Sequence, residues 1–298
     1  MKSIQEVIGK NQDQKDAIEA VLKQIEQSKI LQPYILKFNL NTDEIIQNSL
    51  TLIRFDAYVK AKAEGIDLSG NTNLEGYLSI DSYRRIEFSY RYNEKYEKLL
   101  KIREYVTCWH LDEHMLDAAM KDFIADKDSP AVRLAMVMVS QSIRKDKMPI
   151  RGLFISGANG VGKTHMLAAI AKEFYTKKKR TTIVFFPELI RDLKQNPFGA
   201  DKVVRHLQKT PILMIDDIGS EMQTSFSRDE ILLPVLNARM NNRMITFFTS
   251  NLDMAGLEHH FTQSQYGENE PIKAKRIIER ILALSDFSPM LGDNKRQK

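Results

Sequence analysis

The residues with the clearest chemical meaning form the segment Gly157–Thr164, which has the sequence GANGVGKT. It fits the pattern G-x-x-x-x-G-K-[ST], in which glycines let backbone N–H groups turn toward phosphate oxygens. An apolar stretch (Gly152–Ser156) precedes it and a helical stretch (Met166–Tyr175) follows, which is the strand–loop–helix context of a phosphate-binding loop. The alternative, an ordinary glycine-rich turn with a solvated Lys163, is disfavoured by these flanking elements.

We therefore expect this loop to bind the phosphates of ATP, with Lys163 reaching the β- and γ-phosphates. The hydroxyl of Thr164 would hold Mg²⁺, and Asp216, which follows the apolar stretch Ile212–Ile215, could meet the same ion directly or through water. The expected nucleotide-binding residues are Gly157, Ala158, Asn159, Gly160, Val161, Gly162, Lys163, Thr164, His165 and Asp216. The expected Mg²⁺ ligands are Thr164 and Asp216.

Two further polar residues could act at the γ-phosphate. Neighbouring strand residues point in different directions, so Asp217 can face away from the metal toward an attacking water. A second acid suits hydrolysis better than nucleotide binding alone, although Asp217 could also be a turn residue before Gly219. Asn251 follows the next apolar stretch, Ile245–Thr249, and could sense the nucleotide. Asn at a strand end is equally a common turn former, so both interpretations stay open.

A basic segment near the end of the sequence, Lys273–Leu284, predicts an amphipathic helix. Arg276 and Arg280 lie one turn apart on a common side and could present a guanidinium to a phosphate held by another chain. Surface pairing with Glu279 is the other interpretation. The choice between the two arginines stays open.

Cysteine count and hydropathy exclude several classes of protein. The single cysteine, Cys108, excludes an internal disulfide and any zinc site with two or more thiolates. Cys108, His110 and His114 are spaced as metal ligands could be, as is the pair His259–His260, but such residues more often have packing and surface roles, so we expect no zinc. The longest apolar runs have six residues, against roughly 20 for a membrane-spanning helix. With no secretory signal recognisable, we expect a cytoplasmic protein and no membrane partner.

Charge is distributed unevenly along the 298 residues. Residues 1–125 carry 17 Lys and Arg against 20 Asp and Glu, whereas residues 126–298 carry 27 against 19. A mildly acidic first part and a basic second part suit a partner-binding module joined to a polyanion-binding module, although solubility also explains the excess. The basic run Lys177–Arg180 is either a DNA contact or a solvated helix end.

The elements that must position these residues follow from hydrophobic periodicity. Apolar stretches without polar alternation predict buried parallel strands with helices between them, so we expect an α/β domain with a parallel sheet and a ligand site at the carboxyl ends of its strands. These stretches are Gly152–Ser156, Thr182–Phe186, Ile212–Ile215 and Ile245–Thr249. Before them, helices over Gln14–Ile30 and Thr42–Ala63 and a strand near residues 86–92 predict a small, mostly helical α+β domain.

The segments GANGVGKTHMLAAIAKE, PILMIDDIG, ITFFTSN and KAKRIIERILALS together resemble those of bacterial replicative-helicase loaders of the DnaI/DnaC type, which are P-loop NTPases of the AAA+ class. The resemblance covers residues 150–298, and the segment NLEGY extends it more weakly into the first part. DnaI-type proteins can carry a cysteine-rich zinc site near NLEGY, which the loop GIDLSGNTN lacks here. The roles implied by the resemblance are Walker A for Lys163 and Thr164, Walker B for Asp216 and Asp217, sensor 1 for Asn251, arginine finger for Arg280 and sensor 2 for Arg296.

The resemblance also implies a function. Residues 1–110 would grip a DnaB-type hexameric helicase, residues 111–130 would be a linker, and residues 131–298 would form an AAA+ ATPase that self-assembles and binds single-stranded DNA. Such a primosomal loader hydrolyses ATP, with Arg280 supplied in trans, and delivers the helicase onto DNA during replication initiation or restart. An IstB-like transposition helper ATPase shares this core and stays the alternative. A small-molecule kinase or a non-catalytic nucleotide-binding scaffold fits Asp217, Asn251 and the Arg-bearing helix less well.

Overall fold

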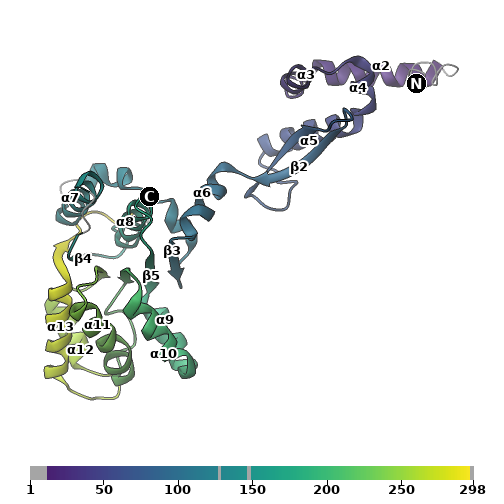
Figure 1. Cartoon of the computed structure of the whole chain (residues 1–298). Helices are drawn as coiled ribbons and strands as arrows, with labels where there is room; N and C mark the ends of the chain where they lie inside the picture. Colours follow the sequence, from purple (N-terminus) through teal and green to yellow (C-terminus); the bar gives the residue numbers. More distant parts are fainter. Residues whose placement is uncertain (1–11, 127–128, 146–148, 296–298) are drawn as a thin grey trace. The chain divides into compact units, whose positions relative to one another are not determined.

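The computed structural model describes residues 12–126, 129–145 and 149–295. The chain divides into two compact units, unit 1 with residues 1–98 and unit 2 with residues 99–298 (Figure 1). Each unit has its own hydrophobic core. None of the helices in the described ranges is both long and apolar enough to cross a membrane.

Unit 1 packs helices against a two-stranded antiparallel hairpin. Its elements are α2 (Gln12–Gln27), α3 (Gln32–Phe38), α4 (Thr42–Gln47), α5 (Ser49–Ala63), β1 (Leu74–Ile80) and β2 (Ile86–Tyr92). The helix predicted over Thr42–Ala63 is two helices, because the Asn48 side chain bonds to the hairpin: its Nδ2 donates to the Arg84 carbonyl at 3.2 Å and its Oδ1 accepts from the Ile86 N–H at 2.7 Å. The break at Asn48 therefore fastens α5 to β2.

Unit 2 is built on a six-stranded parallel sheet in the order β3-β5-β6-β7-β4-β8. The strands are β3 (Val106–Trp109), β4 (Gly152–Ser156), β5 (Thr181–Phe185), β6 (Ile212–Asp216), β7 (Thr246–Ser250) and β8 (Ser285–Pro289). The helices are α7 (Pro130–Lys145), α8 (Lys163–Thr176), α9 (Phe186–Gln195), α10 (Ala200–Lys209), α11 (Leu233–Asn241), α12 (Met254–Thr262) and α13 (Pro271–Leu284). Shorter helical turns are η1 (Glu113–Asp117), η2 (Met120–Asp126), η3 (Pro197–Gly199) and the π-helical η4 (Phe226–Leu232).

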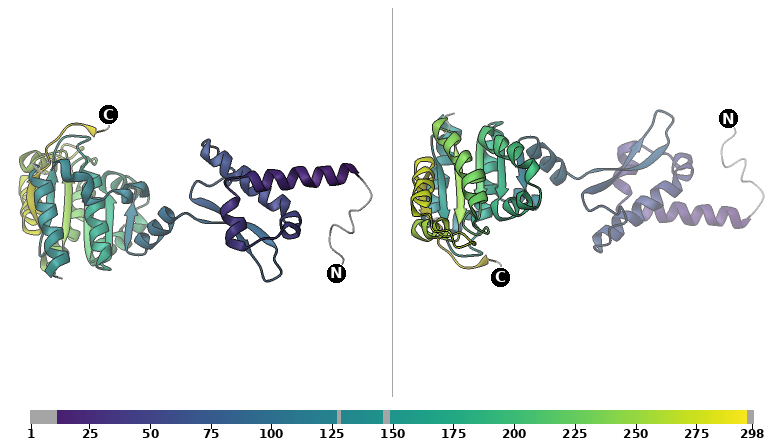
Figure 2. Two further views of the ribbon diagram at one scale, coloured as in Figure 1. Left: turned by 90° about the horizontal axis from the view of Figure 1, so that it is seen from above. Right: turned by 90° about the horizontal axis from the view of Figure 1, so that it is seen from below.

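The predicted α/β class and parallel sheet are confirmed, and the four predicted strands agree with β4, β5, β6 and β7 to within a residue at each end. Helices cover both faces of the sheet (Figure 2). One core lies between the sheet and α7 and α8, and the other between the sheet and α9 to α13. This layering explains why the four strands read as unbroken apolar runs.

The boundary between the units lies earlier than the sequence predicted. Val106–Trp109, expected at the end of the first domain, is the edge strand β3 and pairs with β5. Residues 111–130, expected as a linker, contain η1 and η2, which contact α8. The helix α6 (Glu94–Arg103) spans the division between the units. Residues 106–126 are therefore part of the α/β unit.

A buried arginine fixes one side of this unit. The Arg239 side chain on α11 is fully buried. Its guanidinium donates to the carbonyl oxygens of Leu207 and Thr210, each at 2.8 Å, and to that of Ile245 at 2.6 Å. Its Nε donates to the Thr246 hydroxyl at 2.8 Å. One side chain thus satisfies backbone groups at the end of α10 and at the start of β7.

We expect Arg239→Ala to lower the free energy of unfolding of unit 2 by about 3 to 5 kcal/mol, because several buried carbonyls would lose their donor. Urea denaturation followed by tryptophan fluorescence measures this unit, since the chain's single tryptophan, Trp109, lies in it. The exposed Arg243 supplies the control, and Arg243→Ala should cost less than about 0.5 kcal/mol. A loss below about 1 kcal/mol for Arg239→Ala would contradict the structural role.

Candidate nucleotide-binding site

The predicted phosphate loop joins the end of β4 to the start of α8. Gly160 and Gly162 both have left-handed backbone conformations, with φ of 84° and 103°. A Cβ at Gly160 would also lie 1.9 Å from the Asn294 side-chain oxygen. The left-handed backbone is the reason for glycine at Gly160, because the Asn294 side chain could move away from a Cβ. The loop runs into the amino end of α8, whose first N–H groups and helix dipole attract anions.

Lys163 is the first residue of α8 and is buried. Its ammonium donates to the carbonyl oxygens of Gly157 and Ala158, at 2.8 and 2.9 Å, and to the Asn251 side-chain oxygen at 2.7 Å. The Asn251 amide in turn donates to an Asp217 carboxylate oxygen at 2.7 Å. The structure thus brings together three residues that the sequence analysis singled out on three different elements.

Asp216 is buried at the carboxyl end of β6. Its carboxylate accepts hydrogen bonds from the Thr164 hydroxyl, at 2.9 and 3.1 Å, and from the Thr249 hydroxyl at 2.6 Å. Burial raises the pKa of Asp216 to about 6, and the two hydroxyl hydrogen bonds partly oppose that rise. The Thr164 hydroxyl and the Asp216 carboxylate are hard oxygen donors of the kind that Mg²⁺ prefers.

The residue after β6, Asp217, has a left-handed backbone with φ of 58°, which is strained for a residue with a side chain. Contacts from the end of β7 hold this strained turn: the Asp217 N–H donates to the Thr249 hydroxyl at 2.8 Å and the Ser250 hydroxyl donates to the Ile218 carbonyl at 2.6 Å. The turn that we allowed as an alternative is present. It nevertheless directs Asp217 to the cavity above the phosphate loop.

That cavity has a volume of about 750 Å³. Eight of the residues predicted from the sequence line it: Asn159, Gly160, Gly162, Lys163, Thr164, His165, Asp217 and Asn251. Of the remaining loop residues, the carbonyl oxygens of Gly157 and Ala158 hold Lys163, and Val161 belongs to the buried core.

The sequence analysis missed part of the cavity wall. Met115 and Ala118 come from η1 and the residue after it, and Asp122 and Phe123 come from η2. These residues lie in the expected linker, residues 111–130, where the sequence has no helical or strand periodicity. Other unpredicted lining residues are Phe185, Ser220, Thr249 and Lys295. Thr249 and Ser220 could have been inferred from their neighbours Asn251 and Asp217.

The end of the described chain passes over the phosphate loop. The Lys295 N–H donates to the Gly160 carbonyl at 3.0 Å, and the Lys295 ammonium lies 5.4 Å from the centre of the Phe123 ring. A positive charge is therefore placed at the cavity. Arg296, which the resemblance implies as sensor 2, lies outside the described residues.

Arg280 lies on α13 and does not line the cavity of its own chain. Its guanidinium donates to the Asn237 side chain and to the Arg276 carbonyl, the latter at 2.6 Å. Arg276 is exposed on the same helix. Neither of the candidate arginine fingers is therefore brought to the nucleotide site by this chain's own fold.

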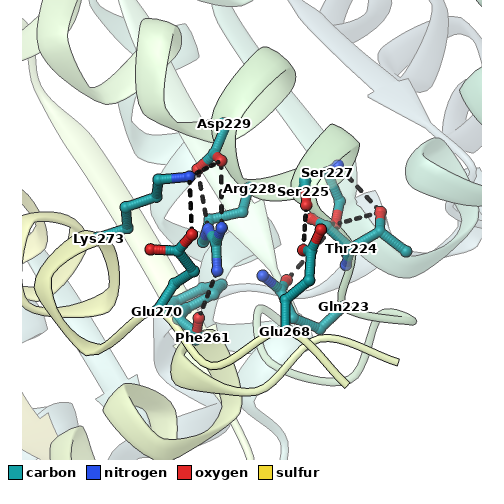
Figure 3. A network of polar contacts seen from close by, with 10 residues as sticks. All are labelled: Gln223, Thr224, Ser225, Ser227, Arg228, Asp229, Phe261, Glu268, Glu270 and Lys273. Carbon is teal, nitrogen blue, oxygen red and sulfur yellow. Dashed lines mark hydrogen bonds and ion pairs between the residues drawn. The ribbon is translucent and has the colours of Figure 1, made fainter. Parts of the chain in front are cut away.

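A polar network built on a buried arginine anchors the amino end of α13 (Figure 3). Arg228 of η4 is fully buried and pairs with the Asp229 carboxylate, at 2.8 and 3.1 Å. It also donates to the Phe261 carbonyl of α12 at 3.1 Å. The Lys273 ammonium of α13 reaches the Asp229 carboxylate at 3.1 Å and that of Glu270 at 3.4 Å. These contacts fix the helix that carries Arg280 against α12 and η4.

The cysteine and histidines considered as metal ligands have other surroundings. Cys108 lies in β3, and burial raises the pKa of its thiol to about 11. His110 lies 3.6 Å from the Asp192 carboxylate, and His260 contacts Glu221 at 3.0 Å. Within the described ranges, no three His, Cys, Asp or Glu side chains gather where they could hold a metal ion.

Comparisons with known proteins agree with this geometry. The family described as the bacterial DnaA ATPase domain matches residues 117–263. The replicative helicase loader DnaI of Bacillus subtilis (strain 168) is 36% identical over 240 residues, which cover 77% of this chain and 76% of that protein. A crystal structure of DnaI superposes with a TM-score of 0.56 at 36% identity, covering 66% of this chain and all of the other. A putative ATP-binding protein of insertion sequence IS232 from Bacillus thuringiensis subsp. berliner is 21% identical over 262 residues, covering 87% of this chain and 96% of that protein.

The parallel sheet, the phosphate loop and the paired acids at the end of β6 define unit 2 as an AAA+ ATPase domain of the P-loop class. The match with DnaI identifies the particular family. Its sequence identity is higher than that of the insertion-sequence protein, and its 240 aligned residues exceed the length of unit 2, so the match includes part of unit 1. The chain belongs to the DnaI family of replicative helicase loaders. The transposition alternative is not favoured.

Thr249 supplies a test of the site's geometry. We expect Thr249→Val to lower ATP turnover at least tenfold with nucleotide affinity changed less than threefold, because its hydroxyl positions Asp216 and Asp217. Phosphate release and titration with a fluorescent nucleotide measure the two quantities. Thr249→Ser keeps the hydroxyl and should retain most of the turnover. Equal turnover in Thr249→Val and the unchanged protein would contradict this positioning role.

Proposed function

We propose that this protein delivers a DnaB-type hexameric helicase onto single-stranded DNA in the primosome, and that ATP hydrolysis in unit 2 drives the delivery. The observation that carries the proposal is the 36% identity to DnaI, which covers 77% of this chain. Unit 2, with residues 99–298, makes up about two thirds of the chain, so the similarity continues into unit 1. A cytoplasmic location follows from this role.

Hydrolysis at the site would use the chain's own residues as follows. Lys163 would exchange its carbonyl partners for β- and γ-phosphate oxygens, and the loop N–H groups would bind the remaining phosphate charge. Asp217 would accept a proton from the attacking water, which Asn251 would orient. Thr164 and Asp216 would hold Mg²⁺. When bound, Mg²⁺ would neutralise charge on the phosphate oxygens.

The unpredicted wall of the cavity suits the other end of the nucleotide. Met115, Ala118 and Phe123 present apolar side chains beside the phosphate loop. Ligand pockets combine such apolar surface with a few polar groups that fix orientation. We infer that this wall receives the adenine ring, so that the segment 113–126 takes part in nucleotide binding.

The γ-phosphate would also need a guanidinium from a second copy. Arg280 lies on α13, outside its own cavity, in a helix fixed by the Arg228 network. An arginine finger stabilises the charge on the transferring phosphoryl group and contributes a factor of about 10³ to 10⁵ in turnover. We infer that the protein self-assembles so that Arg280 of one copy meets the nucleotide of the next.

Complementation tests this arrangement. Arg280→Ala should lower turnover at least 100-fold with little change in ATP affinity, whereas Lys163→Ala should abolish ATP binding. Mixing the two inactive variants should restore measurable phosphate release, because Lys163→Ala copies offer an intact Arg280 to intact sites. Arg276→Ala is the matched control and should stay active. Loss of turnover in Arg276→Ala instead of Arg280→Ala would move the finger to Arg276, and no recovery on mixing would contradict a role in trans.

The helicase-binding role of unit 1 is tested separately. Residues 1–98 have their own apolar core, so we expect this fragment to fold and to co-purify with the hexameric helicase. Residues 99–298 alone should not. Binding by residues 99–298 and not by residues 1–98 would place the grip on unit 2.

A further inference from the structure

Unit 2 has a second cavity of about 950 Å³ that shares no lining residue with the nucleotide cavity. It lies between α10 and β3, at one edge of the sheet, and we call it the edge groove. Thr181, the first residue of β5, and Pro211, which directly precedes β6, line it. Trp109, the last residue of β3, lines it as well, so the edge groove follows the edge strand along its length.

Cations line the edge groove. Lys202, Arg205 and Lys209 are spaced three and seven residues apart and therefore share one face of α10. Arg180, the last residue of the basic run Lys177–Arg180, directly precedes β5 and lines the groove as well. All four are exposed, and none forms an ion pair with a carboxylate of the described residues. Glu104 is the one acidic residue of the described lining.

Two neighbouring rings, tilted toward each other, lie among these cations. The Trp109 and His206 ring centres are 4.6 Å apart, with an angle of 35° between the ring planes. The His206 Nε2 is hydrogen-bonded to the Thr182 hydroxyl at 3.0 Å, which contacts the Thr210 hydroxyl at 3.1 Å. Burial lowers the pKa of His206, which favours its neutral form. The edge groove thus holds an aromatic pair, fixed by the bond from His206 to Thr182, among positively charged side chains.

This combination selects one class of ligand. Single-stranded nucleic acids bind in basic grooves in which aromatic side chains stack on bases while Lys and Arg meet the phosphates. Lys202 and Lys209 are about 10 Å apart along α10, which leaves room for a strand and not only for one anion. An acidic peptide would use the cations and leave the Trp109–His206 surface without a role.

We propose that the edge groove binds single-stranded DNA, with bases stacked on Trp109 and phosphates paired with Lys202, Arg205, Lys209 and Arg180. The proposal rests on the proposed function, in which the loader meets single-stranded DNA, and it assigns the strand a place separate from the nucleotide site. The edge groove thereby gives a function to part of the positive charge that residues 126–298 carry in excess.

Trp109 makes the test local, because it is the chain's single tryptophan. We expect a fluorescein-labelled oligothymidylate to bind the full-length protein, with its anisotropy and the Trp109 emission titrating at the same concentration. The variant Lys202→Gln/Arg205→Gln/Lys209→Gln should bind about 100-fold more weakly at 0.1 M salt, since each lost phosphate contact on a single strand removes about 0.7 from the slope of log K against log salt. The slope itself should fall by about 2.

The matched control is Lys23→Gln/Lys29→Gln/Lys37→Gln, which removes the same charge from exposed positions of unit 1 and should change affinity less than threefold. Circular dichroism and unchanged nucleotide affinity confirm that the groove variant is folded. Unchanged oligonucleotide affinity in the groove variant, without a response of Trp109, would overturn the inference and leave the proposed function standing. Absence of any oligonucleotide binding would overturn both the inference and the DNA part of that function. Equal binding of polyglutamate at Trp109 would show a general anion groove and overturn the assignment to DNA.

Discussion

The nucleotide site depends on one hydroxyl that joins the ends of two neighbouring strands. Thr249, near the end of β7, accepts a hydrogen bond from the Asp217 N–H and donates one to the Asp216 carboxylate. These two contacts fix the acid that faces Thr164 and the acid that faces Asn251 in a single arrangement. These contacts from β7 help to hold the strained backbone of Asp217. If β6 and β7 were paired differently, Thr249 would not reach Asp216 and Asp217, and neither acid would be held at the nucleotide cavity.

The same turn is supported from a second side by α12. Glu221 is buried, accepts from the Gly219 N–H at 2.7 Å and contacts His260 of α12 at 3.0 Å. The next residue of α12, Phe261, supplies the carbonyl that Arg228 binds. One helix therefore anchors both the turn that carries Asp217 and the network that holds the amino end of α13. The nucleotide cavity and the arginine-bearing helix share a common rigid support.

Sequence reasoning succeeded where the physical signal is local. The glycines and Lys163 of the phosphate loop, the apolar strands β4, β5, β6 and β7, and the acids at the end of β6 are each recognisable from a few adjacent residues. The parallel sheet followed because strands covered on both faces must be apolar throughout. These features are sufficient to predict an α/β domain with a parallel sheet and a phosphate-binding loop.

The other features of the fold could not be predicted from short stretches of sequence, because they depend on contacts between residues far apart in the chain. β8, with the sequence SDFSP, has no apolar run and becomes a strand through its pairing with β4. β3 is short and acquires its place from β5, which moved the boundary between the units. The cavity wall at Met115 and Phe123 forms because η1 and η2 pack on α8, and no helical or strand periodicity in the sequence predicts this packing.

Strand β7 also lies between the nucleotide cavity and the helix that lines the edge groove. Arg239 binds backbone and hydroxyl oxygens at its start and carbonyls at the end of α10, the helix that lines the edge groove. The end of β7 carries Thr249, and Asn251 follows at the nucleotide cavity. A buried arginine with this many acceptors is weak evidence for stability alone, since apolar packing can stabilise as well. Its hydrogen bonds hold the end of α10 against the start of β7. The five residues of β7 therefore set the distance between the edge groove, beside α10, and the phosphate loop, beside Asn251.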